Sequence, residues 1–409
     1  MRLLIVTQYF WPENLRINDL VSELAKRGHE ITVLTGKPNY PGGKLFPEFQ
    51  KHPQQFDTYA GARIVRVPLW LRGSRRVSLF LNYVTYAVSA IVFGIPRLRE
   101  RGFDAIFVFQ VSPVTVGVPA IALRRVKRCP VAFWVLDQWP ESLSAVGIVT
   151  SAPALRFLGR FVSFIYNRCD LILSQSKSLV HLIGTYCKDP GRVSYFPNWA
   201  EAAFAESAAA PAPEVPPQTG GFTVMFAGNI GESQDFPTLL ATAEALAGHC
   251  DIRWLIIGNG RMADWVRSEV QRRGLQEKFI LLGHYPVERM PSFYRHADAL
   301  LVSLRPDPVF ALTLPGKVQS YLAAGIPILG MIDGEGAAVI RDAGAGIAVP
   351  AGDSQALATA VLTMSRLPDA ERRAMGERGR EYSRREFDRD LLVSRLESWL
   401  VDLAQKHRA

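Results

Sequence analysis

The sequence contains little that would support a disulfide framework or a cysteine-based metal site. Its four cysteines are widely spaced and form no C-x-x-C pair; they are Cys129, Cys169, Cys187 and Cys250. This pattern indicates free thiols in a reducing cytoplasm. The apolar run at the N-terminus lacks a small-residue cleavage site, so we interpret it as a strand rather than as a signal peptide.

A second absence concerns the first predicted βα turn. Residues 3–7 form the continuous apolar run of a strand buried on both faces, residues 15–27 predict a helix, and residues 30–35 predict the next strand. A dinucleotide-binding unit would carry G-x-G-x-x-G in this turn. The turn here reads Y-F-W-P-E-N, without glycine. This absence weakens the interpretation of the chain as a dinucleotide enzyme.

The composition is that of a globular protein with a strong basic excess. Of 409 residues, 48% are hydrophobic and 21% are charged, and the formal net charge is +9. A basic protein favours anionic partners such as nucleic acid, phosphate ligands or an anionic membrane face. No nucleic-acid recognition motif accompanies the charge, so we expect no nucleic-acid partner.

The order of predicted elements indicates two α/β domains. Strands and helices alternate over residues 1–200 and again over residues 222–385, which predicts a parallel sheet in each half. Residues 201–221 are rich in Ala, Pro and Gly and predict an interdomain linker. Residues 386–409 predict a helix, and the D-x-D at residues 388–390 lies on its charged face, so we expect no metal site there.

The segment L-T-L-P-G-K-V-Q-S-Y-L-A-A-G-I-P-I-L-G, residues 312–330, predicts a turn, a short helix and a buried strand. A helix that begins at Pro-Gly-Lys presents free backbone N–H groups and the ammonium of Lys317 to one point. This arrangement would bind an anion. The alternative is an ordinary loop before a surface helix.

Three segments of the chain resemble a known family. The segment at 312–330 resembles the P-S-K-x-x-E/S-Y-L-A-A-G-K-P donor segment of family-four glycosyltransferases with GT-B fold, in the branch that builds bacterial O-antigen, capsule and exopolysaccharide. The runs P-N-Y-P at 38–41 and D-Q-W-P-E-S at 137–142 resemble motifs of the same branch. The resemblance covers nearly the whole chain. It implies two Rossmann-like domains that face each other across a cleft, with a C-terminal helix that crosses back to the first domain.

The resemblance implies a retaining, metal-independent hexosyl- or N-acetylhexosaminyltransferase that needs no cofactor. It would move a sugar from a nucleotide-sugar, with UDP favoured, to a lipid-linked saccharide during surface polysaccharide synthesis. We would expect the protein in the cytoplasm, peripheral on the inner face of the cell membrane. Two alternatives stay open: a nucleotide-sugar 2-epimerase of the same fold, and a non-catalytic nucleotide-sugar-binding subunit.

The resemblance and the predicted strand ends together give the candidate site residues. The expected catalytic groups are Lys317, Asp137 and Glu141, although Glu141 could instead act at a helix N-terminus. The expected donor contacts are Gly228, Asn229, Gln234, Gly258, Asn259, Gly260, His284, Tyr285, Pro315, Gly316, Gln319 and Ser320. The expected acceptor contacts are Asn14, Arg16, Asn39 and Tyr40. The two glutamates of the family pattern would fall at Leu312 and Ser320, so their contacts are either absent or supplied by other residues such as Gln319 or Asp307.

Residues 77–96 form an uncharged apolar stretch with arginines on both sides. Its length is close to the roughly 20 residues of a membrane span. Three interpretations compete: a transmembrane helix, a buried helix of the first domain, and an in-plane helix on an anionic membrane surface. The basic cluster at residues 124–128 could join the same face.

Overall fold

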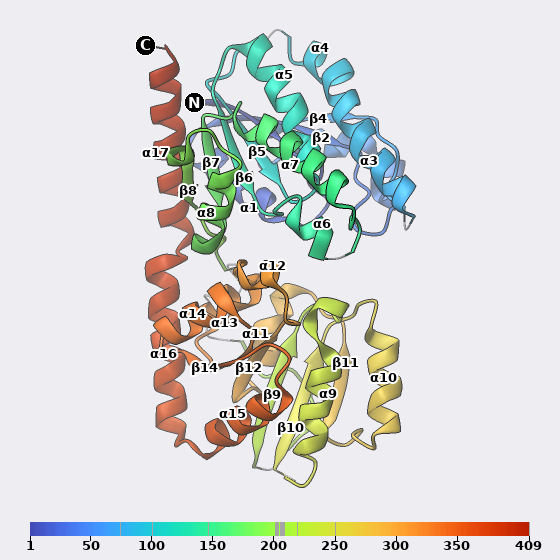
Figure 1. Ribbon diagram of the computed structural model, residues 1–409, viewed down its shortest axis with the longest axis vertical. Helices are drawn as coiled ribbons and strands as arrows, with labels where there is room; N and C mark the ends of the chain where they lie inside the picture. The colour runs from blue at the N-terminus through green and yellow to red at the C-terminus, as the bar shows by residue number, and fades with distance from the viewer. Residues whose placement is uncertain are drawn as a thin grey trace. The chain divides into compact units, whose positions relative to one another are not determined.

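The computed structural model describes residues 1–73, 75–99, 101–145, 147–200, 204, 209–218, 220–249 and 251–408. The chain divides into two compact units (Figure 1). The first contains Met1–Pro197 and Asp390–Ala409, and the second contains Asn198–Arg389. Each unit is an α/β layer structure built on its own sheet, and the two are described separately below.

The first unit contains an eight-stranded sheet in the order β3-β4-β2-β1-β5-β6-β7-β8. All pairs are parallel except the antiparallel pair of β3 with β4. The central strands are buried along their length because helices cover both faces. The strands are β1 Arg2–Val6, β2 Glu30–Gly36, β3 Thr58–Tyr59, β4 Ala62–Val67, β5 Ala105–Gln110, β6 Val131–Val135, β7 Leu171–Ser174 and β8 Val193–Tyr195.

Helices α3, α5 and α7 lie side by side on one face of this sheet (Figure 1). The C-terminal helix α17 lies beside the end of α1, where Glu397 pairs with Arg27 and His29. The helices of this unit are α1 Arg16–Lys26, α2 Pro47–Lys51, α3 Arg76–Ser89, α4 Ile95–Arg97, α5 Gly117–Lys127, α6 Glu141–Ala145, α7 Ala152–Tyr166, α8 Lys177–Thr185 and α17 Arg389–Arg408. The chain therefore returns to its first unit, and the D-x-D at 388–390 lies where α17 begins.

The second unit contains a six-stranded parallel sheet in the order β11-β10-β9-β12-β13-β14. Its strands are β9 Phe222–Ala227, β10 Ile252–Ile257, β11 Phe279–Gly283, β12 Ala299–Ser303, β13 Ile328–Met331 and β14 Gly346–Val349. Its helices are α9 Phe236–Ala245, α10 Ala263–Arg272, α11 Met290–Tyr294, α12 Pro308–Ala311, α13 Gly316–Ala324, α14 Gly334–Asp342, α15 Ser354–Arg366 and α16 Asp369–Glu386. Apolar clusters on both faces of the sheet form the core.

The expected linker at residues 201–221 is in part a structured segment of the second unit. Phe204, Ala212 and Val215 are buried in the core of that unit, and Phe204 stacks on Tyr294. Residues 201–203, 205–208 and 219 of the same stretch lie outside the described residues, as does Cys250. Composition indicated the segment, but it did not show that apolar side chains within it pack on the second sheet.

The apolar stretch at residues 77–96 forms α3, a π-helical turn at Ala90–Gly94, and α4. Among the described residues, Val77–Arg97 is one helix that is long and apolar enough to cross a membrane by length and composition. One side of it packs on the sheet: Tyr86 is buried, and a Cβ on Gly94 would meet a methyl group of Leu34 at 2.8 Å. The helix is thus part of the first unit.

Candidate active site

The second sheet has a topological switch point between β9 and β12. The chain runs from β9 outward to β10 and β11, and then returns to the other side of β9 as β12. In open parallel sheets, ligands bind outside the carboxyl ends of the strands at such a point. Gly228 follows β9 there, and α13 begins close to it.

Helix α13 presents its N-terminus at this edge without a side-chain cap. Pro315 is the N-cap residue in extended conformation and provides no side-chain cap hydrogen bond, while Val318 N donates to Pro315 O at 2.9 Å. Gly316 is exposed, and a Cβ built on it would meet nothing within 4 Å. The free N–H groups and the helix dipole therefore face open space, as an anion site requires.

Lys317 folds back over the end of β9. Its Nζ lies 3.7 Å from the ring centre of Phe226, and a Cβ on Gly228 would meet its Cε at 2.4 Å. Gly228 has φ +142°, so glycine is required there both for the backbone and for the lysine stem. Among the residues that the structure describes, no carboxylate pairs with this ammonium.

Burial lowers the pKa of Lys317 from 10.5 to about 7. Lys317 as a whole residue is partly buried. An ammonium without a counter-ion gains most from an anionic ligand, because the ligand removes the cost of keeping the charge away from water.

The glycine-containing loops after β9 and β10 pack against each other. Gly258 has φ +143°, and a Cβ on it would lie 1.8 Å from the carbonyl oxygen of Gly228. A Cβ on Gly260 would lie 2.3 Å from the carbonyl oxygen of Ile230, whose N–H donates to Asn259 O at 2.9 Å. Gly258 and Gly260 are thus explained by loop–loop packing, which shapes the edge of the site.

The remaining donor candidates divide into loop-forming and exposed groups. Gln234 Oε1 accepts from Gly231 N at 3.2 Å and from Asn229 Nδ2 at 3.4 Å, so Gln234 shapes the loop after β9. His284 follows β11 and is exposed, and Tyr285 packs on Phe293 with ring centres 4.5 Å apart. None of these side chains adds a second positive charge beside Lys317.

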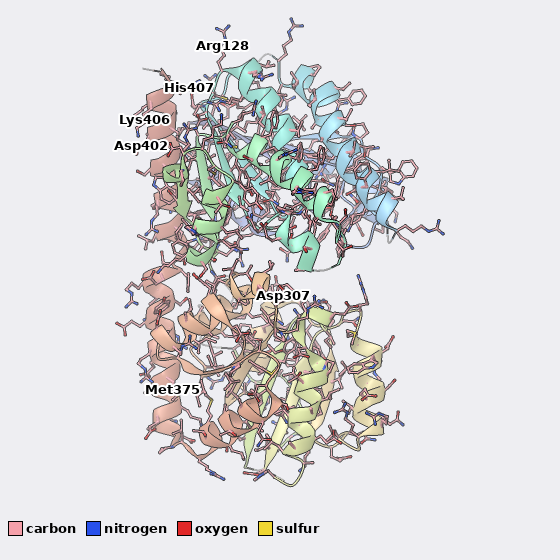
Figure 2. The ribbon with its side chains drawn as sticks, viewed as in Figure 1. Arg128, Asp307, Met375, Asp402, Lys406 and His407 are labelled. Atoms are coloured by element: carbon pink, nitrogen blue, oxygen red, sulfur yellow. The ribbon has the colours of Figure 1, made fainter. Side chains whose placement is uncertain are left out.

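The residues expected to replace the family's paired glutamates make contacts within the second unit. Gln319 is 2% exposed and donates from Nε2 to Asn198 O at 2.7 Å, while its Oε1 is buried without a partner. Ser320 donates to Gly316 O at 3.1 Å inside α13. Asp307 (labelled in Figure 2) accepts from Val309 N at 2.8 Å and caps α12. Gln319 is the member of this group that contacts the segment following the first unit.

In the first unit, Asp137 lies just past the carboxyl end of β6. Its Oδ2 accepts from Trp139 Nε1 at 3.0 Å, and its backbone carbonyl accepts from Gln110 Nε2 at 2.8 Å. Burial raises the pKa of Asp137, and the Trp139 and Ser112 donors offset only part of this effect. Asp137 as a whole residue is partly exposed.

Glu141, in contrast, is held by protein groups at the start of α6. Its Oε1 accepts from the Tyr186 hydroxyl at 2.5 Å, and its Oε2 accepts from Gln138 Nε2 at 3.2 Å. These contacts tie α6 to the loop after β6 and to residue 186 beyond α8. Both oxygens of Glu141 thus have protein partners in the first unit.

Glu13 is a buried carboxylate that the sequence analysis did not single out. It is 2% exposed; Oε1 accepts from Asn39 N at 2.8 Å and Tyr40 N at 2.7 Å, and Oε2 accepts from Phe10 N at 2.8 Å. Burial raises its pKa to about 7, although the three N–H donors and the charge of Arg66 act in the opposite direction. Glu13 joins the loops that follow β1 and β2. An isolated acidic residue in a loop gives no sequence signal for this role.

The four acceptor candidates lie in these two loops with different exposures. Asn39 is fully buried; its Oδ1 accepts from Arg72 N at 2.9 Å. Tyr40 is partly buried and lies 5.0 Å from Tyr9 between ring centres. Asn14 is exposed and Arg16 is partly exposed at the start of α1. Asn39 is therefore a structural residue, whereas the Tyr40, Asn14 and Arg16 side chains can meet a ligand.

Two parallel-sheet units of this kind, with a C-terminal helix returning to the first, define the GT-B fold of glycosyltransferases. The model of the Glycosyl transferase 4-like domain matches residues 14–199, and the model of Glycosyl transferases group 1 matches residues 221–366. The chain belongs to this glycosyltransferase family, and the family resemblance inferred from its motifs is confirmed. It is an enzyme of the glycosyltransferase class.

Named relatives and a solved structure agree with this assignment. The chain is 27% identical over 266 residues to WbjE of Pseudomonas aeruginosa, named as a probable glycosyltransferase, with 61% of this chain and 65% of that protein covered. It is 23% identical over 341 residues to the colanic acid biosynthesis glycosyl transferase WcaI of Escherichia coli strain K12, with 80% and 82% covered. The structure of Anabaena HepE in complex with UDP and glucose shares the fold, with TM-score 0.68, 13% identity, and 98% and 100% covered.

Proposed function

We propose that the protein transfers a sugar, with retention of configuration, from a nucleoside diphosphate sugar to a lipid-linked saccharide in bacterial surface polysaccharide synthesis. The proposed nucleoside diphosphate sugar donor is supported mainly by one observation. The Lys317 ammonium lies at the N-terminus of α13, beside Gly228. A departing diphosphate is stabilised by such fixed positive charge without a metal. The UDP complex of HepE supports a uridine donor, and the relative WcaI supports the polysaccharide pathway.

A thermal-shift titration with UDP, GDP, ADP, CMP and NAD tests the donor half. Binding at about 100 times Kd adds about 2.7 kcal/mol to stability, so a specific nucleotide raises Tm clearly. We expect UDP to give the largest rise. A response to NAD alone would refute the proposal. Product analysis without acceptor separates a transferase from an epimerase, because only an epimerase changes the sugar with no acceptor present.

The membrane half of the proposal is supported by one face of the first unit. Helices α3 and α7 expose large apolar side chains there, including Phe80 at 64% and Phe157 at 69%. Exposed arginines accompany them on α5 and α7, and Arg128 projects from the end of α5 (Figure 2). Apolar side chains mixed with basic ones fit an anionic bilayer surface, which supports the proposal that the protein is peripheral on the inner face of the cell membrane.

Flotation with anionic and zwitterionic vesicles tests this placement. Burying one Phe side chain contributes about 1.5–3 kcal/mol, so Phe80→Ser and Phe157→Ser should each weaken vesicle binding roughly tenfold. Trp265→Ser is the matched control, because Trp265 is an exposed aromatic residue on α10 of the second unit. Equal flotation of all three variants with wild-type protein would remove the membrane face from the proposal.

A further inference from the structure

Arg72 is a partly buried cation at the carboxyl edge of the first sheet. Its Nη1 donates to the Tyr9 hydroxyl at 3.2 Å, and its guanidinium carbon lies 5.4 Å from the ring centre of Tyr40. The Tyr83 phenol also lies against it. Among the residues that the structure describes, no carboxylate pairs with this guanidinium. Three neutral phenols orient the cation but leave its charge unneutralised.

Neighbouring residues in the first unit fix the position of Arg72 through hydrogen bonds and close packing. Its backbone N–H donates to Asn39 Oδ1 at 2.9 Å, and a Cβ on Gly43 would lie 2.0 Å from its carbonyl oxygen. The Tyr9 hydroxyl, which accepts from Arg72, donates in turn to Asn82 Oδ1 at 3.0 Å. A side chain that is positioned in advance loses little entropy when a ligand binds. An oriented guanidinium suits the oxygens of a phosphate group.

An exposed apolar surface begins directly beside this cation. The segment before Arg72 lies along α3: Trp70 N donates to Thr85 Oγ1 at 2.8 Å, and the Leu71 carbonyl accepts from Ser78 Oγ at 3.3 Å. Trp70 is 56% exposed, and Val77 and Phe80 on the first turns of α3 are exposed as well. A ligand that satisfies both features carries a phosphate at one end of a hydrocarbon chain.

We propose that Arg72 binds the phosphate or diphosphate group of the acceptor, whose hydrocarbon chain leaves across Trp70 and the start of α3. The inference rests on the proposed function, because it assigns the lipid-linked acceptor to the first unit. It adds a binding residue outside the P-N-Y-P and D-Q-W-P-E-S motifs. The saccharide would then extend from the Tyr9, Tyr40 and Tyr83 rings along the carboxyl edge of the sheet.

Isothermal titration with geranyl diphosphate tests the site, with geraniol and inorganic pyrophosphate as the two half-ligands. We expect the diphosphate ester to bind wild-type protein more tightly than either half-ligand. A lost charge-assisted contact reduces affinity about tenfold to a hundredfold, which we expect for Arg72→Ala. Arg72→Lys keeps the charge and should lose less. A Tm close to that of wild type confirms that each variant is folded.

Lys317→Ala distinguishes this site from the donor site. We expect geranyl diphosphate to bind Lys317→Ala as it binds wild-type protein, and UDP to stabilise Arg72→Ala as it stabilises wild-type protein. Loss of geranyl diphosphate binding in Lys317→Ala, with binding retained in Arg72→Ala, would overturn the proposal, because the probe would then occupy the diphosphate site of the second unit.

Two further outcomes separate the ligand sources. If Arg72→Ala loses binding to phosphatidylglycerol vesicles but keeps binding to geranyl diphosphate, Arg72 contacts bilayer headgroups and the acceptor assignment is wrong. If UDP binds wild-type protein and geranyl diphosphate does not, the phosphate site fails while the proposed transferase function stands. If geranyl diphosphate binds through Arg72 and no nucleotide binds, the phosphate site stands and the donor proposal fails.

Discussion

Replacing Lys317 by methionine should raise stability and lower turnover at least a hundredfold. Each pKa unit corresponds to about 1.4 kcal/mol, so the lowering from 10.5 to about 7 sets an upper limit of roughly 4–5 kcal/mol on the cost of burying the ammonium. The side chain reaches solvent, and screening reduces this cost, so we expect Lys317→Met to gain about 1–3 kcal/mol. Methionine keeps the length of the stem over Phe226 and Gly228.

The pH dependence of stability tests independently whether the Lys317 ammonium destabilises the folded protein. Because burial lowers the pKa of Lys317, the unfolded chain binds more protons than the folded protein between pH about 7 and 10.5. Stability conferred through this group therefore rises with pH across that window. Denaturant unfolding of wild type and Lys317→Met at several pH values should show the two curves converging toward pH 10.5.

The substitutions of Lys317 should lower enzymatic activity, whereas Lys317→Met should raise stability. Removing one preorganised charge from a developing anion typically costs a hundredfold or more in turnover, and we expect this for both Lys317→Met and Lys317→Ala. In wild-type protein, kcat/KM for the donor should fall as pH rises through about 7, where the free enzyme loses the ammonium proton. Unchanged turnover in either variant would refute the assignment of Lys317 to the leaving diphosphate.

Three further changes test the rest of the site. Gly228→Ala should lower turnover at least tenfold by displacing the lysine stem, whereas Gly248→Ala, at an open position after α9, should leave it nearly unchanged; steady-state rates compare them. Asp137→Asn should reduce turnover more than Glu141→Gln, which the same assay measures, because protein groups occupy both Glu141 oxygens. Glu13→Ala leaves three backbone donors without an acceptor and should cost about 2–4 kcal/mol in urea unfolding.

The parallel strands were predictable because burial on both faces produces uninterrupted apolar runs. The predicted strand at residues 3–7 corresponds to β1, and that at residues 30–35 corresponds to β2. Strand β14, residues 346–349, was not predicted. It is a short edge strand of partly exposed residues, so its composition resembles that of a loop. The two-residue β3 is antiparallel and shorter than any periodic signal can reveal.

Parts of the candidate site that depend on a local sequence pattern were predictable. Parts that depend on contacts between side chains distant in the sequence were not. Pro-Gly-Lys predicts a helix that begins at this point, and α13 begins at Gly316 with Pro315 as its N-cap residue. The partners of Glu13 and Arg72 lie far along the chain, in the loops after β2 and on α3, and depend on the order of strands in the sheet. No local pattern encodes those contacts.

The two units therefore build their ligand edges in different ways. The second unit has glycine loops, a helix N-terminus and one ammonium, which would suit the diphosphate that the proposed nucleoside diphosphate sugars share. The first unit has no glycine in its first turn; the side chain of Glu13 fixes the loop instead, and three tyrosines surround Arg72. Substitution of side chains can change the shape of a binding surface without altering the backbone. We infer that the missing glycine reflects an edge whose specificity is built from side chains.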